Sequence, residues 1–310
     1  MGIRRVAGIV ALSCSIVLST ACVARRRVIT RNKSTPSQAL LTSDKNALLT
    51  RINNLYQSIQ TLSITANLVP ALGSVNKGKI TEYKDVTAYI LFKKPDEIRI
   101  VGLYPVVRTT AFDMVSNGDD FRVYIPSKSR FIEGRNELSA PSPNKLENLR
   151  PSVFLDALFV RPPGPKEATV ITDFTDEDTA AYILHVLYND AQGDPHIGRE
   201  IWFERLTLNI ARQIIYDPNG EIVTDARYSE WTKYNGVPFP KVIDINRPKD
   251  EYGVVITVVK AEINKPITDE KFVLRQPEGT TLQVLGEKPA QQAPPPAAGA
   301  SASRQKKTTK

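Results

Sequence analysis

Alternation of polar and apolar side chains with a period of two dominates this sequence from residue 61 onward. In residues 61–67, Leu62, Ile64 and Ala66 alternate with polar residues. Comparable runs occur at 86–93, 98–102, 110–114, 121–125, 169–173, 181–188, 200–208, 211–216, 222–234, 241–246 and 254–263. Turn signals separate many of these runs, and Asp217-Pro218-Asn219-Gly220 is the strongest of them. The pattern predicts an antiparallel meander of short strands.

Several of these strands carry apolar or aromatic side chains on both faces. In the run 86–93, Ile90 and Phe92 alternate with Tyr89 and Leu91. A sheet with one face in water would carry polar side chains on that face. We therefore expect a curved sheet that has one face on a core and the other lining an apolar cavity.

Two amphipathic helices are expected beside the strands. The first begins near Ser43, a residue type that can cap a helix, and its apolar positions Leu48, Ile52, Leu55 and Ile59 recur at helical spacing. The second covers residues 149–158 and contains Val153, Phe154 and Leu158; the proline-rich segment 161–165 ends it. Each apolar face needs a surface to cover, so both helices are candidate lids of the cavity.

The N-terminal segment has the parts of an export signal. Arg4 and Arg5 precede an apolar run of thirteen residues, 6–18, which is shorter than the roughly 20 residues that a membrane-spanning helix needs. Three small residues then precede Cys22. This ending resembles the lipobox of bacterial lipoproteins, although Ser19 stands where that family prefers Leu. The resemblance implies cleavage after residue 21 and acylation of Cys22 with chains such as palmitate; a cleaved signal that leaves a free thiol is the alternative.

Charge and cysteine content narrow the function classes. The chain has a formal net charge of +8, with 41 basic and 33 acidic residues. Twelve basic residues lie in the signal, in the segment 25–33 and in the tail after residue 287, which leaves a body with a charge of about −4. A nucleic-acid binder would carry its positive charge on the folded surface, so we do not expect this protein to bind nucleic acid. Cys14 and Cys22 are the two cysteines, so no disulfide is expected after cleavage.

We find no catalytic or metal-binding pattern in the sequence. His185 and His196 are the two histidines; the first is expected in a strand and the second in a loop, and neither has a partner at metal-ligand spacing. An acidic turn at residues 173–178 lacks the spacing of a calcium loop. Trp202 and Trp231 are expected in the core or the cavity wall. We therefore expect a protein that is not an enzyme and has no cofactor or metal.

The segment 98–107 predicts an unusual hairpin. Gly102 and Pro105 should bend the chain between two strands and place Leu103, Tyr104 and Val106 at the tip. Hairpin tips are normally polar, so an apolar tip indicates contact with a membrane or a partner. The alternative is that the tip folds back over the core.

Taken in order, these features resemble the outer-membrane lipoprotein receptor LolB and its periplasmic relative LolA, over roughly residues 45–265. Segments 98–116 and 152–162 carry most of the resemblance, and by position Leu103 matches the protruding Leu of LolB-like proteins. The family implies a mainly β (α+β) fold, a strongly curved antiparallel sheet or incomplete barrel closed by helices. Composition and the resemblance together predict a signal at 1–21, a lipidated Cys22 with a flexible basic tether at 22–43, a LolA/LolB-like half-barrel at 44–287 and a disordered tail rich in Pro, Ala and Lys at 288–310.

The expected cavity wall and lids comprise Leu48, Ile52, Leu55, Ile90, Phe92, Phe112, Val153, Phe154, Leu158 and Trp202. The leading hypothesis is a monomeric carrier or receptor that binds acyl chains of lipoproteins or of another lipid and passes them to the outer membrane. Its lipid anchor would hold it on the periplasmic face, and a periplasmic carrier protein could deliver its cargo. The alternative is a structural or sensing envelope lipoprotein whose barrel binds a protein partner or a cell-wall component.

Overall fold

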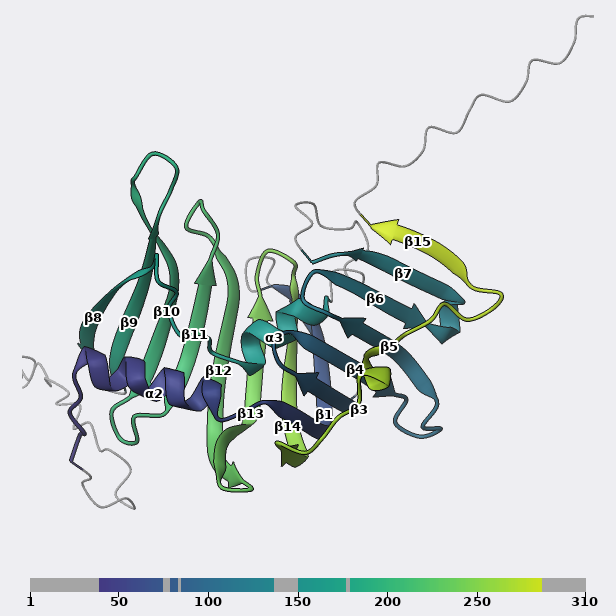
Figure 1. Cartoon of the computed structure of the whole chain (residues 1–310), viewed down its shortest axis with the longest axis horizontal. Coiled ribbons are helices and arrows are strands. Elements are labelled where there is room, and N and C mark those ends of the chain that lie inside the picture. The colour runs from purple at the N-terminus through teal and green to yellow at the C-terminus, as the bar shows by residue number, and fades with distance from the viewer. Residues whose placement is uncertain (1–38, 75–78, 83–84, 137–149, 177–178, 286–310) are drawn as a thin grey trace, which may run out of the picture.

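The computed structural model describes residues 39–74, 79–82, 85–136, 150–176 and 179–285. The expected signal, Cys22, most of the expected tether and the C-terminal tail lie outside these residues. Within the described part, two α-helices accompany fifteen strands that belong to one curved, open sheet (Figure 1). The mainly β, strongly curved antiparallel fold expected from the sequence is confirmed.

The sheet contains two meanders. The first comprises β1 (Thr61–Ser74), β2 (Lys79–Glu82), β3 (Val86–Lys93), β4 (Glu97–Leu103), β5 (Thr110–Ser116), β6 (Asp120–Ile125) and β7 (Arg130–Arg135). The second comprises β8 (Ala168–Thr175), β9 (Ala180–Asn189), β10 (Pro195–Glu204), β11 (Ile210–Tyr216), β12 (Ile222–Tyr234), β13 (Val237–Arg247) and β14 (Tyr252–Ile263). β15 (Thr281–Leu285) then pairs in parallel with β7, whereas the other described pairs are antiparallel.

β1 joins the two meanders. It pairs with β3 on one side and with β14 on the other, so that Leu62 lies beside both Phe92 and Ile263. The resulting strand order is β15-β7-β6-β5-β4-β3-β1-β14-β13-β12-β11-β10-β9-β8, with β2 paired only to β1. β8 and β15 are therefore the free edges of an open sheet.

Three strands and several strand boundaries differ from the expectations. β2, β7 and β15 are additional strands. β10 begins at Pro195, so His196 lies in a strand and pairs with Tyr188 instead of lying in a loop. The histidine ring also lies 3.0 Å from a carboxylate oxygen of Asp190, the residue that follows β9.

The core lies on the concave face of the sheet. Corresponding positions of neighbouring strands stack there, as in the row Ile64, Ile90, Ile100 and Met114 across β1, β3, β4 and β5, and all four side chains are buried. These residues form one cluster with the apolar faces of both helices. Burial of this shared face is what holds the helices on the sheet.

Part of the convex face is covered as well. Arg99 on β4 forms a bidentate ion pair with the Asp113 carboxylate on β5, with hydrogen bonds of 3.0 and 2.7 Å. The Arg99 guanidinium also donates to the Lys271 carbonyl. Beside this pair, Leu274 packs on Val115. The segment after β14 thus covers the convex face around β4 and β5, where Val115 is buried, whereas Tyr89 on β3 stays 44% exposed.

α2 (Lys45–Gln57) lies across the second meander, and α3 (Pro151–Leu158) lies near the centre of the sheet (Figure 1). The cap of α2 is Asp44 rather than Ser43, because the Asp44 side chain accepts the Ala47 N–H at 2.8 Å. α3 ends at Leu158, where the backbone becomes extended, before the proline-rich segment. Among the described residues, no helix is both long and apolar enough to cross a membrane.

Polar contacts hold both ends of α2. At its beginning, Lys45 donates to the Thr169 carbonyl on β8, and in its middle Arg51 donates to the Asn209 side chain. After its end, Asn264 accepts the Gln60 N–H at 2.8 Å and donates to the Ser58 carbonyl at 2.8 Å. Asn264 directly follows β14, so the last turn of α2 is tied to the end of that strand.

Substitution of the cap distinguishes the two candidate cap residues. We expect Asp44→Ala to lower the free energy of unfolding by about 1 kcal/mol, because it leaves a first-turn N–H without its acceptor. Ser43→Ala is the matched control and should change it by less than about 0.5 kcal/mol. Urea unfolding followed by circular dichroism measures both values, and equal losses would contradict the assignment of Asp44.

The contacts of Asn264 predict local protection of α2. Asn264 has a φ of 60°, which glycine adopts freely, so Asn264→Gly removes the side-chain bonds without backbone strain. We expect hydrogen exchange in the last turn of α2 to become about tenfold faster. Asn235→Gly is the control, since Asn235 has a φ of 50° in the β12–β13 turn. Unchanged exchange in Asn264→Gly would show that packing alone holds the helix.

Candidate functional site

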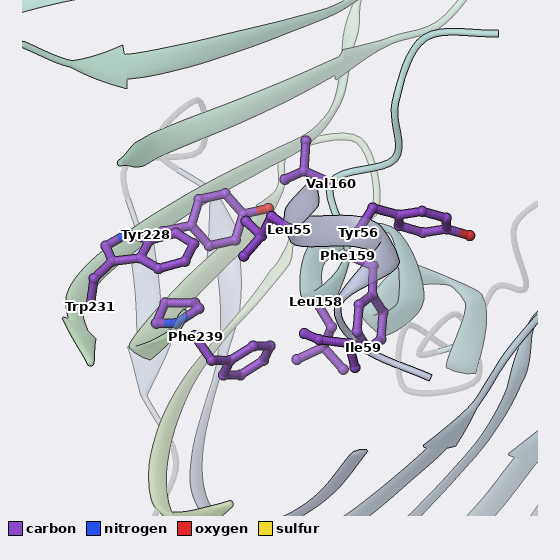
Figure 2. Close-up of a pocket in the computed structure, with 10 residues that line it drawn as sticks. Leu55, Tyr56, Ile59, Leu158, Phe159, Val160, Tyr228, Trp231 and Phe239 are labelled. Atoms are coloured by element: carbon purple, nitrogen blue, oxygen red, sulfur yellow. The ribbon is translucent and has the colours of Figure 1, made fainter. Parts of the chain in front are cut away.

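A small apolar pocket lies where α2, the segment after α3 and the strands β12 and β13 meet (Figure 2). Its volume is about 20 Å³, enough for about one water molecule. Its lining is Leu55, Tyr56, Ile59, Leu158, Phe159, Val160, Tyr228, Trp231, Phe239 and Pro240. Large side chains therefore fill most of the space expected for a cavity.

Three parts of the chain build this pocket. α2 and the residues that follow it contribute Leu55, Tyr56 and Ile59, and the end of α3 contributes a run of three apolar residues, 158–160. Phe159 of that run packs on Phe92, with ring centroids 4.0 Å apart. Figure 2 shows these side chains opposite the Tyr228 and Trp231 rings of β12. The two rings lie 6.4 Å apart.

A local distortion of β12 brings Tyr228 and Trp231 into the same pocket. Residues three apart in a regular strand point to opposite faces. Between these two, Glu230 has a φ of 53°, in the left-handed region that an ordinary strand does not use. The Trp231 indole N–H also donates to the Ile210 carbonyl at 3.0 Å, which fixes the ring. The alternation of side chains along a strand could not predict that Trp231 shares a face with Tyr228, because the distortion at Glu230 interrupts the alternation.

A larger groove opens beside the pocket, along α2. It has a volume of about 450 Å³ and is lined by Ala47, Thr50, Arg51, Asn54, Leu55, Ser58, Asn209, Ile210, Trp231 and Pro238. Leu55 and Trp231 belong to both linings. These two side chains therefore stand between a polar-sided groove and the apolar pocket.

Two polar atoms stay unpaired on the buried face below α3. The Tyr228 hydroxyl and the Gln213 side-chain oxygen have no hydrogen-bond partner among the described residues. Their residues are 7% and 2% exposed. Burial raises the pKa of Tyr228 well above its usual value, so the hydroxyl is neutral and can donate. Burial likewise raises the pKa of the nearby Asp156 carboxyl on α3.

The structure distributes the sequence-predicted cavity residues over two faces. Leu55 and Leu158 line the pocket. Six others lie in the buried cluster behind it, and Phe112 packs against that cluster while half-buried; the six are Leu48, Ile52, Ile90, Phe92, Val153 and Phe154. The pocket residues that sequence reasoning did not single out are Phe159, Val160, Tyr228, Phe239 and Pro240. The unbroken apolar run 157–160 is the signal that could have identified Phe159 and Val160.

Trp202 corrects the expected cavity wall. Its chain neighbours Ile201 and Phe203 are fully buried on the concave side, so the indole lies on the opposite face. There it packs on Phe174, with centroids 5.4 Å apart, and lies under the Arg212 guanidinium. Because strand side chains alternate, Trp202 cannot line a cavity that its neighbours face.

The hairpin between β4 and β5 is apolar at its tip, and of the three residues expected there Tyr104 and Val106 lie at the tip whereas Leu103 does not. Leu103 is a half-buried strand residue paired with Thr87 and Thr110. Val106 and Val107 are 91% and 68% exposed, and Tyr104 is 39% exposed. The tip is therefore 104–107, and it does not fold back over the core.

The remaining polar clusters consist of paired groups. His185 lies 3.1 Å from a Glu200 oxygen and 2.9 Å from the Thr172 hydroxyl on the convex face. In the described part of the chain, no three His, Cys, Asp or Glu side chains gather as a metal site would require. Asp173 of the acidic turn pairs with Arg205 at 2.9 Å, and residues 177–178 of that turn lie outside the described residues.

Comparison with known proteins identifies the fold. No protein-family model and no curated protein sequence matches the chain significantly. Among solved structures, a LolA superfamily protein from Nitrosomonas europaea matches with a TM-score of 0.50 and 14% identity, over 75% of this chain and 99% of that chain. A DUF1329 family protein from Desulfovibrio piger (TM-score 0.48, 17% identity) covers 73% and 95% of the two chains. A putative outer membrane lipoprotein-sorting protein domain from Vibrio parahaemolyticus (0.48, 11%) covers 73% and 94%.

The first of these similarities concerns the whole architecture. It spans nearly the full length of the Nitrosomonas protein, and at this low identity it is a similarity of fold. It does not distinguish a LolA-like from a LolB-like protein. The chain described here thus has a LolA-like fold, with a curved open sheet and two helices on its concave face.

Proposed function

We propose that this chain is a lipid-anchored envelope protein that binds an acyl chain of a lipoprotein or another lipid between α2 and the concave sheet. It would then pass that chain to the outer membrane from the periplasmic side. The observation that carries the proposal is the apolar pocket at the junction of both helices with β12 and β13. The LolA-like fold and the lipobox-like segment before Cys22 support it.

The pocket has to enlarge before it can hold an acyl chain. Ligand pockets usually measure about 300–1,000 Å³, whereas this one measures about 20 Å³. Each CH₂ group moved from water into it would contribute roughly 0.8 kcal/mol of binding free energy. A long acyl chain can therefore offset the free-energy cost of moving a lid away from the sheet. No chemical reaction is needed for such a carrier.

α2 is the element suited to that movement. It buries Leu48 and Ile52 completely, and its other residues are half-buried or exposed. α3 buries six of its eight residues, and Phe159 and Val160 after it are buried too. Elements with few buried contacts open at lower free-energy cost. The groove along α2 is the route by which a chain would pass Leu55 and Trp231.

The exposed tip of the β4–β5 hairpin fits a membrane-facing role. Val106 and Val107 protrude into solvent, and Arg108 follows them in the turn. Transfer of valine side chains from water to the acyl boundary is favourable, and a neighbouring arginine is attracted to anionic headgroups. This surface would touch the bilayer while the anchor at Cys22 keeps the protein near it.

A different observation supports a second candidate function, the binding of a protein partner or cell-wall component. In the described conformation aromatic side chains fill the space under the helices, as expected of an envelope protein that binds a protein partner or cell-wall component instead of carrying lipid. Whether the protein holds lipid after purification separates the two functions.

We expect native mass spectrometry of the purified full chain to show bound lipid besides any lipid linked to Cys22. Leu55→Arg places a charge between groove and pocket and should lower the bound lipid about tenfold. Asn53→Arg is the matched control, because Asn53 is exposed on the same helix, and it should keep the lipid of the unmodified protein. Absence of non-covalent lipid from the unmodified chain would contradict the carrier function and favour the second candidate.

The membrane role of the hairpin tip is tested with a charge. In a chain that carries Cys22→Ala to remove the anchor, Val106→Glu should weaken binding to phosphatidylethanolamine–phosphatidylglycerol vesicles about tenfold, because a carboxylate replaces an apolar group in the interface. Folding should be unaffected, since Val106 is 91% exposed. Val259→Glu, at a site on β14 that is 63% exposed, is the control. Equal vesicle binding by both variants in co-sedimentation would exclude the tip as the contact.

A further inference from the structure

The Tyr228 hydroxyl is a polar group inside an otherwise apolar pocket. Tyr228 is only 7% exposed and lines the pocket, and its hydroxyl has no hydrogen-bond partner among the described residues. Buried hydroxyls in native proteins are nearly always paired, so an unpaired one needs an explanation. In Figure 2 the hydroxyl points away from β12 toward Leu55 and the segment 158–160.

A second unpaired atom lies on the neighbouring strand. Gln213 on β11 lies opposite Ala226 on β12, so Gln213 and Tyr228 are diagonal neighbours on one face of the sheet. The Gln213 amide nitrogen donates to the Asp156 carbonyl of α3 at 2.8 Å, while its oxygen stays without a partner within the described chain. The polar notch formed by the Tyr228 hydroxyl and the Gln213 oxygen therefore offers one donor and one acceptor.

We propose that this notch binds the carbonyl-bearing end of an acyl chain, as an ester or amide, so that the site selects acylated lipids over plain hydrocarbon. This inference rests on the proposed function and specifies its ligand. The Tyr228 hydroxyl donates to the carbonyl oxygen, and the Gln213 oxygen accepts an amide N–H or a hydroxyl of the same head.

The two spaces beside the notch fit the two parts of such a ligand. The hydrocarbon would extend along the apolar lining toward Ile59 and Phe239. The polar head would leave past Leu55 and Trp231 into the groove, whose lining includes Arg51, Asn54 and Asn209. The Tyr228 ring of the notch lies 6.4 Å from the Trp231 ring at this boundary, where the carbonyl of an acyl lipid would join the two parts.

The test compares a polar and an apolar probe of similar length. N-phenyl-1-naphthylamine bound to the purified full chain is displaced by methyl decanoate or by undecane. We expect Tyr228→Phe to weaken methyl decanoate binding about fivefold, the worth of one hydrogen bond, and to leave undecane binding within about twofold. Tyr234→Phe, on the same strand but outside the pocket lining, should change neither affinity. Unchanged undecane binding also shows that the variant has folded with its pocket intact.

The outcomes separate this inference from the function on which it rests. If the unmodified chain binds both probes and Tyr228→Phe binds methyl decanoate equally well, the notch holds only a structural water, and the inference is wrong while the carrier function stands. If neither probe displaces the dye from the unmodified chain, both the inference and the carrier function are wrong.

Discussion

β1 is hydrogen-bonded on both sides, to β3 and to β14, and this double pairing determines the rest of the architecture. Without it the two meanders would be separate sheets, each with an uncovered apolar face. It also fixes α2, because the helix leads directly into β1 and its last turn is held by Asn264, the residue that follows β14. The long-range pairing of β1 with β14 thus joins the two meanders into one sheet and fixes the position of α2. It thereby also fixes the place of the pocket between α2 and the sheet.

The two helices are packed on the concave face to different extents, with six buried residues in α3 and two in α2. The proposed opening for a ligand depends on this difference. α3 is wedged into the core, where Gln213 of β11 also donates to its backbone. α2 is attached by two buried side chains, by three half-buried ones (Leu49, Leu55 and Tyr56) and by polar contacts. The pocket lies where the firmly packed helix and the weakly packed helix meet. The unpaired Tyr228 hydroxyl in that pocket destabilises the folded protein, and a hydrogen bond to a bound polar atom would remove this destabilisation.

Much of the fold could be predicted from local sequence patterns. Hydrophobic periodicity gave the bounds of β12 and located α2 and α3 within a few residues, and the Pro-Asn-Gly turn identified the β11–β12 hairpin. The candidate site was less accessible. Trp202 and Trp231 look equivalent in the sequence, yet they lie on opposite faces because the left-handed Glu230 interrupts the period in β12. Leu103 looked like the hairpin tip, but the strand ladder extends through it and leaves Val106 to protrude.

The sequence by itself determined the alternation of strands, the two amphipathic helices, the apolar hairpin and the lipobox-like segment, since each depends on residues close together in the chain. Only the tertiary structure decided that β1 pairs with β14, that Trp231 instead of Trp202 lines the pocket, and that the pocket holds no more than about one water molecule. These properties depend on the pairing of distant strands and on how side-chain volumes fill the space between them. Neither is encoded in any single segment.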